Sequence, residues 1–109
     1  MANDFNLTSV SSDIRKIKKA DPSSIKRIGL FGSLVRGDYS QESDIDILIE
    51  YDETTGFDLE SFTRFCDFCN RLSDELNVSY GREVDMVHFE GDVEKVLFAF
   101  DGKEEIVWL

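Results

Sequence analysis

The sequence has few of the residues that build disulfide frameworks, metal centres or membrane spans. Its 109 residues include two cysteines, one histidine and one proline. No stretch approaches the ~20 apolar residues that a membrane-spanning helix needs. Residues 1–7 also contain no apolar run of the kind found in a signal peptide. Two cysteines are too few for a secreted disulfide scaffold. We therefore expect a protein of the reducing cytoplasm that does not enter a membrane.

Basic residues are scarce as well. The chain has 12 Lys and Arg against 23 Asp and Glu, which gives a formal net charge of −11. Because a phosphate backbone would repel such a chain, broad nucleic-acid binding is not expected. A nucleotide can still bind if metal ions or local hydrogen-bond donors offset its charge. A basic protein is a compatible partner.

Hydrophobic residues make up 41% of the chain and include nine Phe. This is enough for a single domain, residues 1–109, around one core, with residues 1–6 polar and frayed. Periodicity predicts elements in the order α-β-α-β-α-β-α-β. The predicted helices are 8–20, the short turn 33–36, 57–77 and 93–100, and the predicted strands are 25–31, 44–50, 83–89 and 106–109. We assign the α/β (α+β) class, a small mixed β-sheet with flanking helices.

Two carboxylates stand on one face of the second predicted strand. In residues 44–50 (DIDILIE), the three isoleucines face one side, while Asp44 and Asp46 face the other together with Leu48 and Glu50. Like charges this close repel each other unless a cation lies between them. Mg²⁺ takes hard oxygen ligands and keeps places for water and substrate phosphates. We therefore predict that Asp44 and Asp46 bind a divalent metal.

A glycine and a serine follow the first predicted strand, and one aspartate interrupts the third. Free N–H groups at the Gly32-Ser33 turn favour phosphate, and the glycine permits close approach. Asp85 lies in an otherwise apolar strand, where a carboxylate needs a partner or a function. If that strand neighbours the strand of Asp44, the three carboxylates converge. Asp85 can then help to hold a second metal or accept a proton.

The pattern Gly32-Ser33, ten residues, Asp44-x-Asp46 resembles the signature of the DNA polymerase β-like nucleotidyltransferase superfamily. The size of the chain is similar to that of its minimal nucleotidyltransferase (MNT) branch. The resemblance implies a polymerase β-like palm fold. It also implies transfer of a nucleoside monophosphate, in the first place AMP from ATP, to a hydroxyl group with release of pyrophosphate. The implied cofactor is Mg²⁺. The implied site consists of catalytic, metal-binding carboxylates at Asp44, Asp46 and Asp85, and of nucleotide-binding residues at Gly32, Ser33 and Arg36.

Larger members of the superfamily add a domain that binds the acceptor, and here we expect a partner to supply the acceptor. The chain resembles the MNT antitoxins, which pair with HEPN-type ribonuclease toxins and silence them by attaching AMP to a toxin tyrosine. A HEPN-type toxin is therefore the expected partner. Two alternatives stay open. One is a small-molecule nucleotidyltransferase completed as a homo-oligomer, and the other is a non-catalytic module that masks a partner protein.

The remaining distinctive residues are assigned to packing. Cys66-x-x-Cys69 supplies half of a zinc site, but His88 is the only further soft ligand, and zinc sites need three or four ligands. Both cysteines also fall on the apolar stripe of the helix at 57–77, so we predict that they pack in the core. The other members of this predicted stripe are Phe62, Phe65, Leu72 and Leu76. His88 is given a structural role. Phe68 falls off the predicted stripe, and we expect it to meet a partner.

Overall fold

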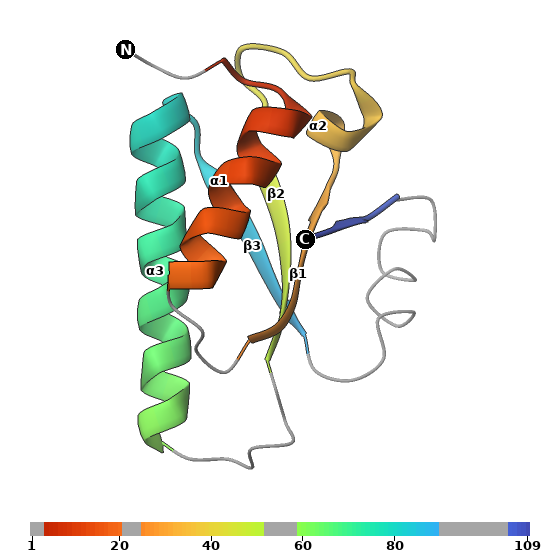
Figure 1. Ribbon diagram of the computed structural model, residues 1–109. Helices are drawn as coiled ribbons and strands as arrows, with labels where there is room; N and C mark the ends of the chain where they lie inside the picture. The colour runs from red at the N-terminus through yellow and green to blue at the C-terminus, as the bar shows by residue number, and fades with distance from the viewer. Residues whose placement is uncertain (1–3, 21–24, 52–58, 90–104) are drawn as a thin grey trace.

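The computed structural model describes residues 4–20, 25–51, 59–89 and 105–109 (Figure 1). The helices are α1 (Leu7–Ala20), α2 (Ser33–Arg36) and α3 (Leu59–Tyr80). The strands are β1 (Ile25–Phe31), β2 (Ile45–Tyr51), β3 (Val84–Phe89) and β4 (Val107–Trp108). The predicted helix at 93–100 lies outside the described residues. Among the described helices, none has both the length and the apolar character that crossing a membrane requires.

The four strands form one mixed sheet in the order β3-β2-β1-β4. Strand β1 runs antiparallel to both β2 and β4, whereas β2 and β3 run parallel. The predicted mixed sheet with flanking helices is therefore confirmed. This topology brings the start of β2, the start of β3 and the end of β1 to the same edge of the sheet, beside α2 (Figure 1).

Helices α1 and α3 pack on one face of the sheet and enclose the main core (Figure 1). Helix α1 begins where the Asn6 side chain accepts a hydrogen bond from the backbone N–H of Ser9, at 2.8 Å, which caps its first turn. Its buried side includes Val10, Ile14 and Ile17, at helical spacing. Phe5, in the segment expected to be frayed, packs against the core, while residues 1–3 lie outside the described residues.

Phe68 is completely buried, at 0% exposure, so the prediction that it meets a partner is wrong. Phe62, which we placed on the stripe, is 42% exposed. The buried side of α3 shares Phe65, Cys69, Leu72 and Leu76 with the predicted stripe, but it is rotated about the helix axis toward Phe68 and away from Phe62. Each residue turns a helix by about 100°, so this small error in angle moves a whole column of side chains into or out of the core. The buried residues of α3 are Phe65, Phe68, Cys69, Leu72, Leu76 and Tyr80.

The opposite face of the sheet holds a second, smaller cluster of Phe31, Leu48 and Phe89. Beside it, the side chain of Glu50 is 2% exposed and accepts a hydrogen bond from Nε of Arg27 at 2.8 Å. The guanidinium carbon of Arg27 lies 4.4 Å from the ring centroid of Trp108. A carboxylate as buried as that of Glu50 requires a positively charged partner, which here is Arg27. The alternation predicted for residues 44–50 is thus confirmed, with the isoleucines on the helical face and Leu48 and Glu50 on the other.

Replacing Phe68 with Ala should destabilise the fold by about 3–5 kcal/mol, because it leaves a cavity in the core beneath α3. Phe62→Ala, on the same helix, should cost on the order of 1 kcal/mol, because that ring is already 42% exposed. Urea unfolding followed by circular dichroism measures both losses. Equal losses, or a larger loss for Phe62→Ala, would contradict the assigned orientation of α3.

Candidate active site

The turn between β1 and α2 depends on a glycine. Gly32 has φ 78° and ψ −153°, a combination that is essentially restricted to glycine. A Cβ atom at this position would also collide with Oδ2 of Asp46. The carboxylate of Asp46 therefore lies directly against the backbone of the turn. Both the backbone angle and the contact exclude any larger residue from position 32.

The parallel pairing of β2 and β3 brings the predicted carboxylates together. Asp46 is the register partner of Asp85. Asp44 immediately precedes β2, and its side chain forms a hydrogen bond with Asp85. The backbone N–H of Ile45 donates to the carbonyl of Glu83 at 2.9 Å, which holds the two strand starts in place. The expected neighbourhood of the two strands is therefore present, and all three carboxylates gather at one edge of the sheet.

This edge carries excess negative charge. Desolvation, then the charge of Asp44 and its hydrogen bond, and finally the charge of Glu83, raise the pKa of Asp85 above its ordinary value. A raised carboxyl pKa means that the folded site favours a bound proton between Asp44 and Asp85. A metal cation placed there would relieve the same repulsion.

The donor set fits magnesium better than zinc. Within the described residues, no group of three His, Cys, Asp or Glu forms a metal cluster. Mg²⁺ is usually held by one or two carboxylates, and water and substrate phosphates are its other ligands. The pair of Asp44 and Asp85 and the adjacent Asp46 can provide the carboxylates. Zinc needs three or four protein ligands.

Cys69 packs in the core, as predicted. Burial, and secondly the charge of Cys66, raise the pKa of the Cys69 thiol to about 12, so this side chain is neutral.

A cleft of about 440 Å³ opens at this edge. It unites four of the six predicted site residues, and its lining consists of Phe31, Gly32, Arg36, Asp46, Asp85, Met86 and Val87. Asp44 and Ser33 are not among the lining residues. Ser33 is half-buried at the first position of α2, and Nε of Arg36 lies 3.2 Å from Oδ2 of Asp38. Ser33 lies beside the cleft. The cleft is open, combines three charged side chains with apolar ones, and is large enough for part of a nucleotide.

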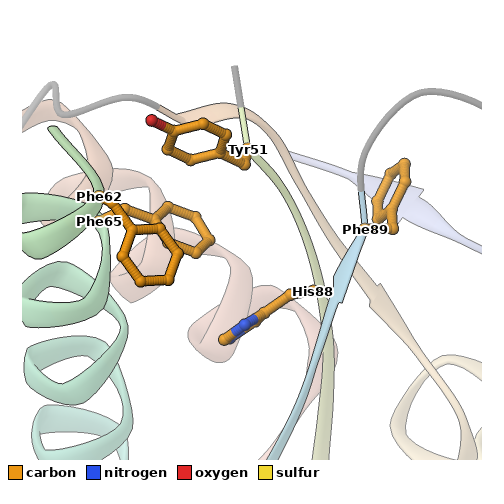
Figure 2. Close-up of a pocket in the computed structure, with 5 residues that line it drawn as sticks. All are labelled: Tyr51, Phe62, Phe65, His88 and Phe89. Carbon is orange, nitrogen blue, oxygen red and sulfur yellow. The ribbon is translucent and has the colours of Figure 1, made fainter. Parts of the chain in front are cut away.

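A second pocket, of about 360 Å³, has a different character (Figure 2). It lies at the other ends of β2 and β3, away from Asp46 and Asp85. In Figure 2 the side chains of Tyr51, Phe65 and His88 lie on one side of the sheet, and Phe89 points to the other. The ring centroids of His88 and Phe65 are 5.2 Å apart, in keeping with a structural role for His88. Because no described carboxylate lines this aromatic pocket, it is a poor site for a metal-bound triphosphate.

Sequence reasoning missed Arg82. Its Nη1 donates hydrogen bonds to the carbonyl oxygens of Ser40 and Ser43, in the loop that leads to Asp44. No sequence pattern signals a contact between a side chain and backbone carbonyls that lie about forty residues away in the chain. The only cue was its position in the short segment that precedes Asp85.

The chain is similar to known nucleotidyltransferases. A family model described as a nucleotidyltransferase domain matches residues 11–109. A relative from Methanocaldococcus jannaschii, named as a candidate protein adenylyltransferase, is 36% identical over 83 residues, which cover 74% of this chain and 76% of the relative. The protein adenylyltransferase MntA of Thermococcus cleftensis is 35% identical over 63 residues, 58% of this chain and 54% of its own length.

Among solved structures, the chain resembles a mutant of the toxin–antitoxin MntA–HpeT. The TM-score is 0.54 at 22% identity, and the match covers 90% of this chain and 71% of the other. At this identity the likeness concerns the fold.

Asp44→Asn should lower the pKa of Asp85, because it removes the neighbouring negative charge. In the native protein the raised pKa means that the proton on Asp85 stabilises the fold at low pH. This contribution is present below the unfolded-state pKa and is lost as the pH rises through the raised value. Carboxyl-carbon NMR titration of Asp85 measures the midpoint in both proteins. An unchanged midpoint in Asp44→Asn would show that the two carboxylates do not interact.

Gly32→Ala should destabilise the protein by about 1–3 kcal/mol through backbone strain and should also weaken ATP binding, because its methyl group displaces Asp46. Gly37→Ala is the matched control. Gly37 also has a positive φ, 85°, but an added Cβ there would meet nothing within 4 Å. Thermal unfolding and calorimetric titration with Mg²⁺ and ATP separate the two effects. Equal ATP affinity in the two variants would contradict a role for the contact between Gly32 and Asp46.

Proposed function

Because the chain belongs to the nucleotidyltransferase domain family, we propose that it transfers AMP from ATP to a hydroxyl group of a partner protein. The observation that carries this proposal is the convergence of Gly32, Asp46 and Asp85 on one cleft, with Asp44 hydrogen-bonded to Asp85. The relatives named as protein adenylyltransferases support a protein acceptor in preference to a small molecule.

Mg²⁺ is the proposed cofactor, held by Asp44 and Asp46 with Asp85 as a third carboxylate. When bound, the ion supplies positive charge to the phosphates of the nucleotide. Support comes from the raised pKa of Asp85, which reflects, after desolvation, the unbalanced negative charge of Asp44 at this edge. Without a cation, the net charge of −11 would oppose binding of a triphosphate.

The side chains at the cleft have complementary roles in this proposal. The Gly32-Ser33 turn offers its backbone and the Ser33 hydroxyl to the β- and γ-phosphates. Arg36, now paired with Asp38 at 3.2 Å, is exposed and can donate to a phosphate instead. Arginine suits this role because its fork of N–H donors matches phosphate oxygens. Asp85, an exposed carboxylate with a raised pKa, is a suitable general base.

The transfer is a direct displacement. The hydroxyl oxygen of the acceptor attacks the α-phosphorus of ATP, and the bond between that phosphorus and the bridging oxygen to the β-phosphate breaks. The proton of the hydroxyl passes to Asp85, and pyrophosphate leaves with the electron pair of the broken bond. Chemistry of this kind depends mainly on positioning and on electrostatic stabilisation of the transferred group. The protein needs only a few rigidly held groups, and the ends of three adjacent strands supply them.

The proposed partner is a HEPN-type toxin of the cytoplasm. MntA, the name of one relative, also names one member of the solved toxin–antitoxin pair MntA–HpeT. We infer by likeness that this chain is an antitoxin, and its acidic character suits a basic partner. Completion of the site by a second copy of the chain is the alternative, and it predicts a small-molecule acceptor.

Incubating the protein with the product of the neighbouring gene, ATP and Mg²⁺ should add AMP to that product, as seen by intact mass spectrometry. Asp85→Asn should slow the addition by about 10²–10⁴-fold, the usual contribution of a general base. Asp74→Asn is the control, because Asp74 is an exposed carboxylate on α3 outside the cleft. If the partner is neutralised without a mass change, and Asp44, Asp46 and Asp85 variants neutralise it equally well, the chain is a masking module and not an enzyme.

A further inference from the structure

The side chain of Arg82 connects the two segments that lead into the acidic edge. Arg82 follows the turn at Gly81 and stands three residues before Asp85. Its Nη1 donates to the carbonyl oxygen of Ser40 at 2.7 Å and to that of Ser43 at 2.8 Å. Ser43 immediately precedes Asp44. One guanidinium group therefore joins the loop that precedes Asp44 to the segment that precedes Asp85.

The loop that Arg82 holds gains little support from the core. Residues 37–42 are exposed, and Ser43 is half-buried. The loop closes on itself through the hydrogen bond from the backbone N–H of Ser40 to Oγ of Ser43, at 2.8 Å. A second bond runs from the N–H of Ser43 to the carbonyl of Ser40, at 3.3 Å. These bonds shape the turn internally, whereas Arg82 fixes its place relative to β3.

Arg82 is itself held on two sides. Its guanidinium carbon lies 3.6 Å from the centroid of the Phe5 ring, a close cation–π contact. The Phe5 ring in turn meets Tyr39 and Tyr80 edge to face, with centroids 5.1 and 5.9 Å away. The carbonyl of Arg82 accepts a hydrogen bond from Nδ2 of Asn77, on α3, at 2.9 Å. Backbone and side chain are thus both fixed before the chain enters β3.

We propose that Arg82 is a positioning residue that sets the placement of Asp44 against Asp85, and that Phe5 holds Arg82 in the required orientation. The two hydrogen bonds from Arg82 affect the affinity for the divalent cation and, through that affinity, the rate of AMP transfer. The consequence for catalysis therefore rests on the proposed function. Residues that orient metal ligands commonly change metal affinity or activity by 10–100-fold when they are removed. Neither Arg82 nor Phe5 lines the cleft, so both act through the carboxylates.

The test compares Arg82→Ala, Arg82→Lys and Phe5→Leu with Arg64→Ala. Arg64 is an exposed arginine of α3 that pairs with Glu60 one helical turn away, so its loss changes the net charge equally without touching the loop. The first measurement is calorimetric titration with ATP at a series of Mg²⁺ concentrations. Arg82→Ala should raise the Mg²⁺ concentration for half-maximal ATP binding by about 10–100-fold. Arg82→Lys and Phe5→Leu should give smaller rises, and Arg64→Ala should give none.

The second measurement is hydrogen exchange of the backbone amides. In Arg82→Ala the amides of Ser43 and Ile45 should exchange faster, whereas those at the centre of α3 should not. Guanidinium ion, added at concentrations far below those that unfold proteins, should lower the Mg²⁺ concentration for half-maximal ATP binding in Arg82→Ala toward the native value. It should leave that concentration unchanged in Arg64→Ala. A purely structural role would show as lower stability without this rescue.

A loosened loop with an unchanged Mg²⁺ requirement in Arg82→Ala would overturn the proposal. If Arg82→Ala does not fold, the rises in Arg82→Lys and Phe5→Leu decide, and two unchanged values overturn it equally. If the native protein binds ATP with Mg²⁺ but modifies no partner, the proposed function fails while the Arg82 comparison still stands. If the native protein shows no Mg²⁺-dependent ATP binding, both proposals fail.

Discussion

The mutual repulsion of carboxylates at one edge of the sheet is the constraint on which the rest of the structure depends. Asp46 stands opposite Asp85 in parallel register, and Asp44 shares a hydrogen bond with Asp85. The core holds this unfavourable arrangement in place. The isoleucines of β2 are fully buried, at 0% exposure, on the helical face. A slip of one residue would move them to the opposite face and bring the carboxylates into the core. Hydrophobic burial therefore fixes the register that keeps the charges together, and the proposed cation would relieve their repulsion.

The same edge is where the backbone leaves the sheet, and the connections there are specialised. Because β1 is antiparallel to β2, its end at Phe31 meets the start of β2, and Gly32 brings the turn against Asp46. The loop that leads to Asp44 is exposed, and Arg82 ties it to the start of β3. The rigid elements thus contribute Asp46 and Asp85, while a turn and a tethered loop contribute Gly32 and Asp44. The sheet thus places two of the three carboxylates, and the cleft beside them is open.

Local patterns predicted the elements well and the tertiary contacts poorly. The strand at 25–31 and the turn at 33–36 begin and end as expected, because Gly32 interrupts a clear apolar run. The cleft also collects Gly32, Arg36 and Asp46, which lie close together in the sequence, and Asp85, the register partner of Asp46. The strand order could not be predicted, since periodicity carries no information on which strands pair. Phe68 was misplaced because a small error in the angle of a helical stripe exchanges buried and exposed rings. Arg82 was missed because its acceptors are backbone carbonyls, which any residue type provides.

Calorimetric titration of ATP into the protein, with and without Mg²⁺, tests the central account most directly when native protein is compared with Asp44→Asn and Asp46→Asn. The account predicts that ATP binds the native protein only when Mg²⁺ is present, because the acidic edge repels the triphosphate until a cation offsets its charge. Both variants should lose most of this Mg²⁺-dependent affinity while circular dichroism shows an intact fold. Undiminished Mg²⁺-dependent binding when both carboxylates are removed together would contradict the assignment of this edge as the metal and nucleotide site.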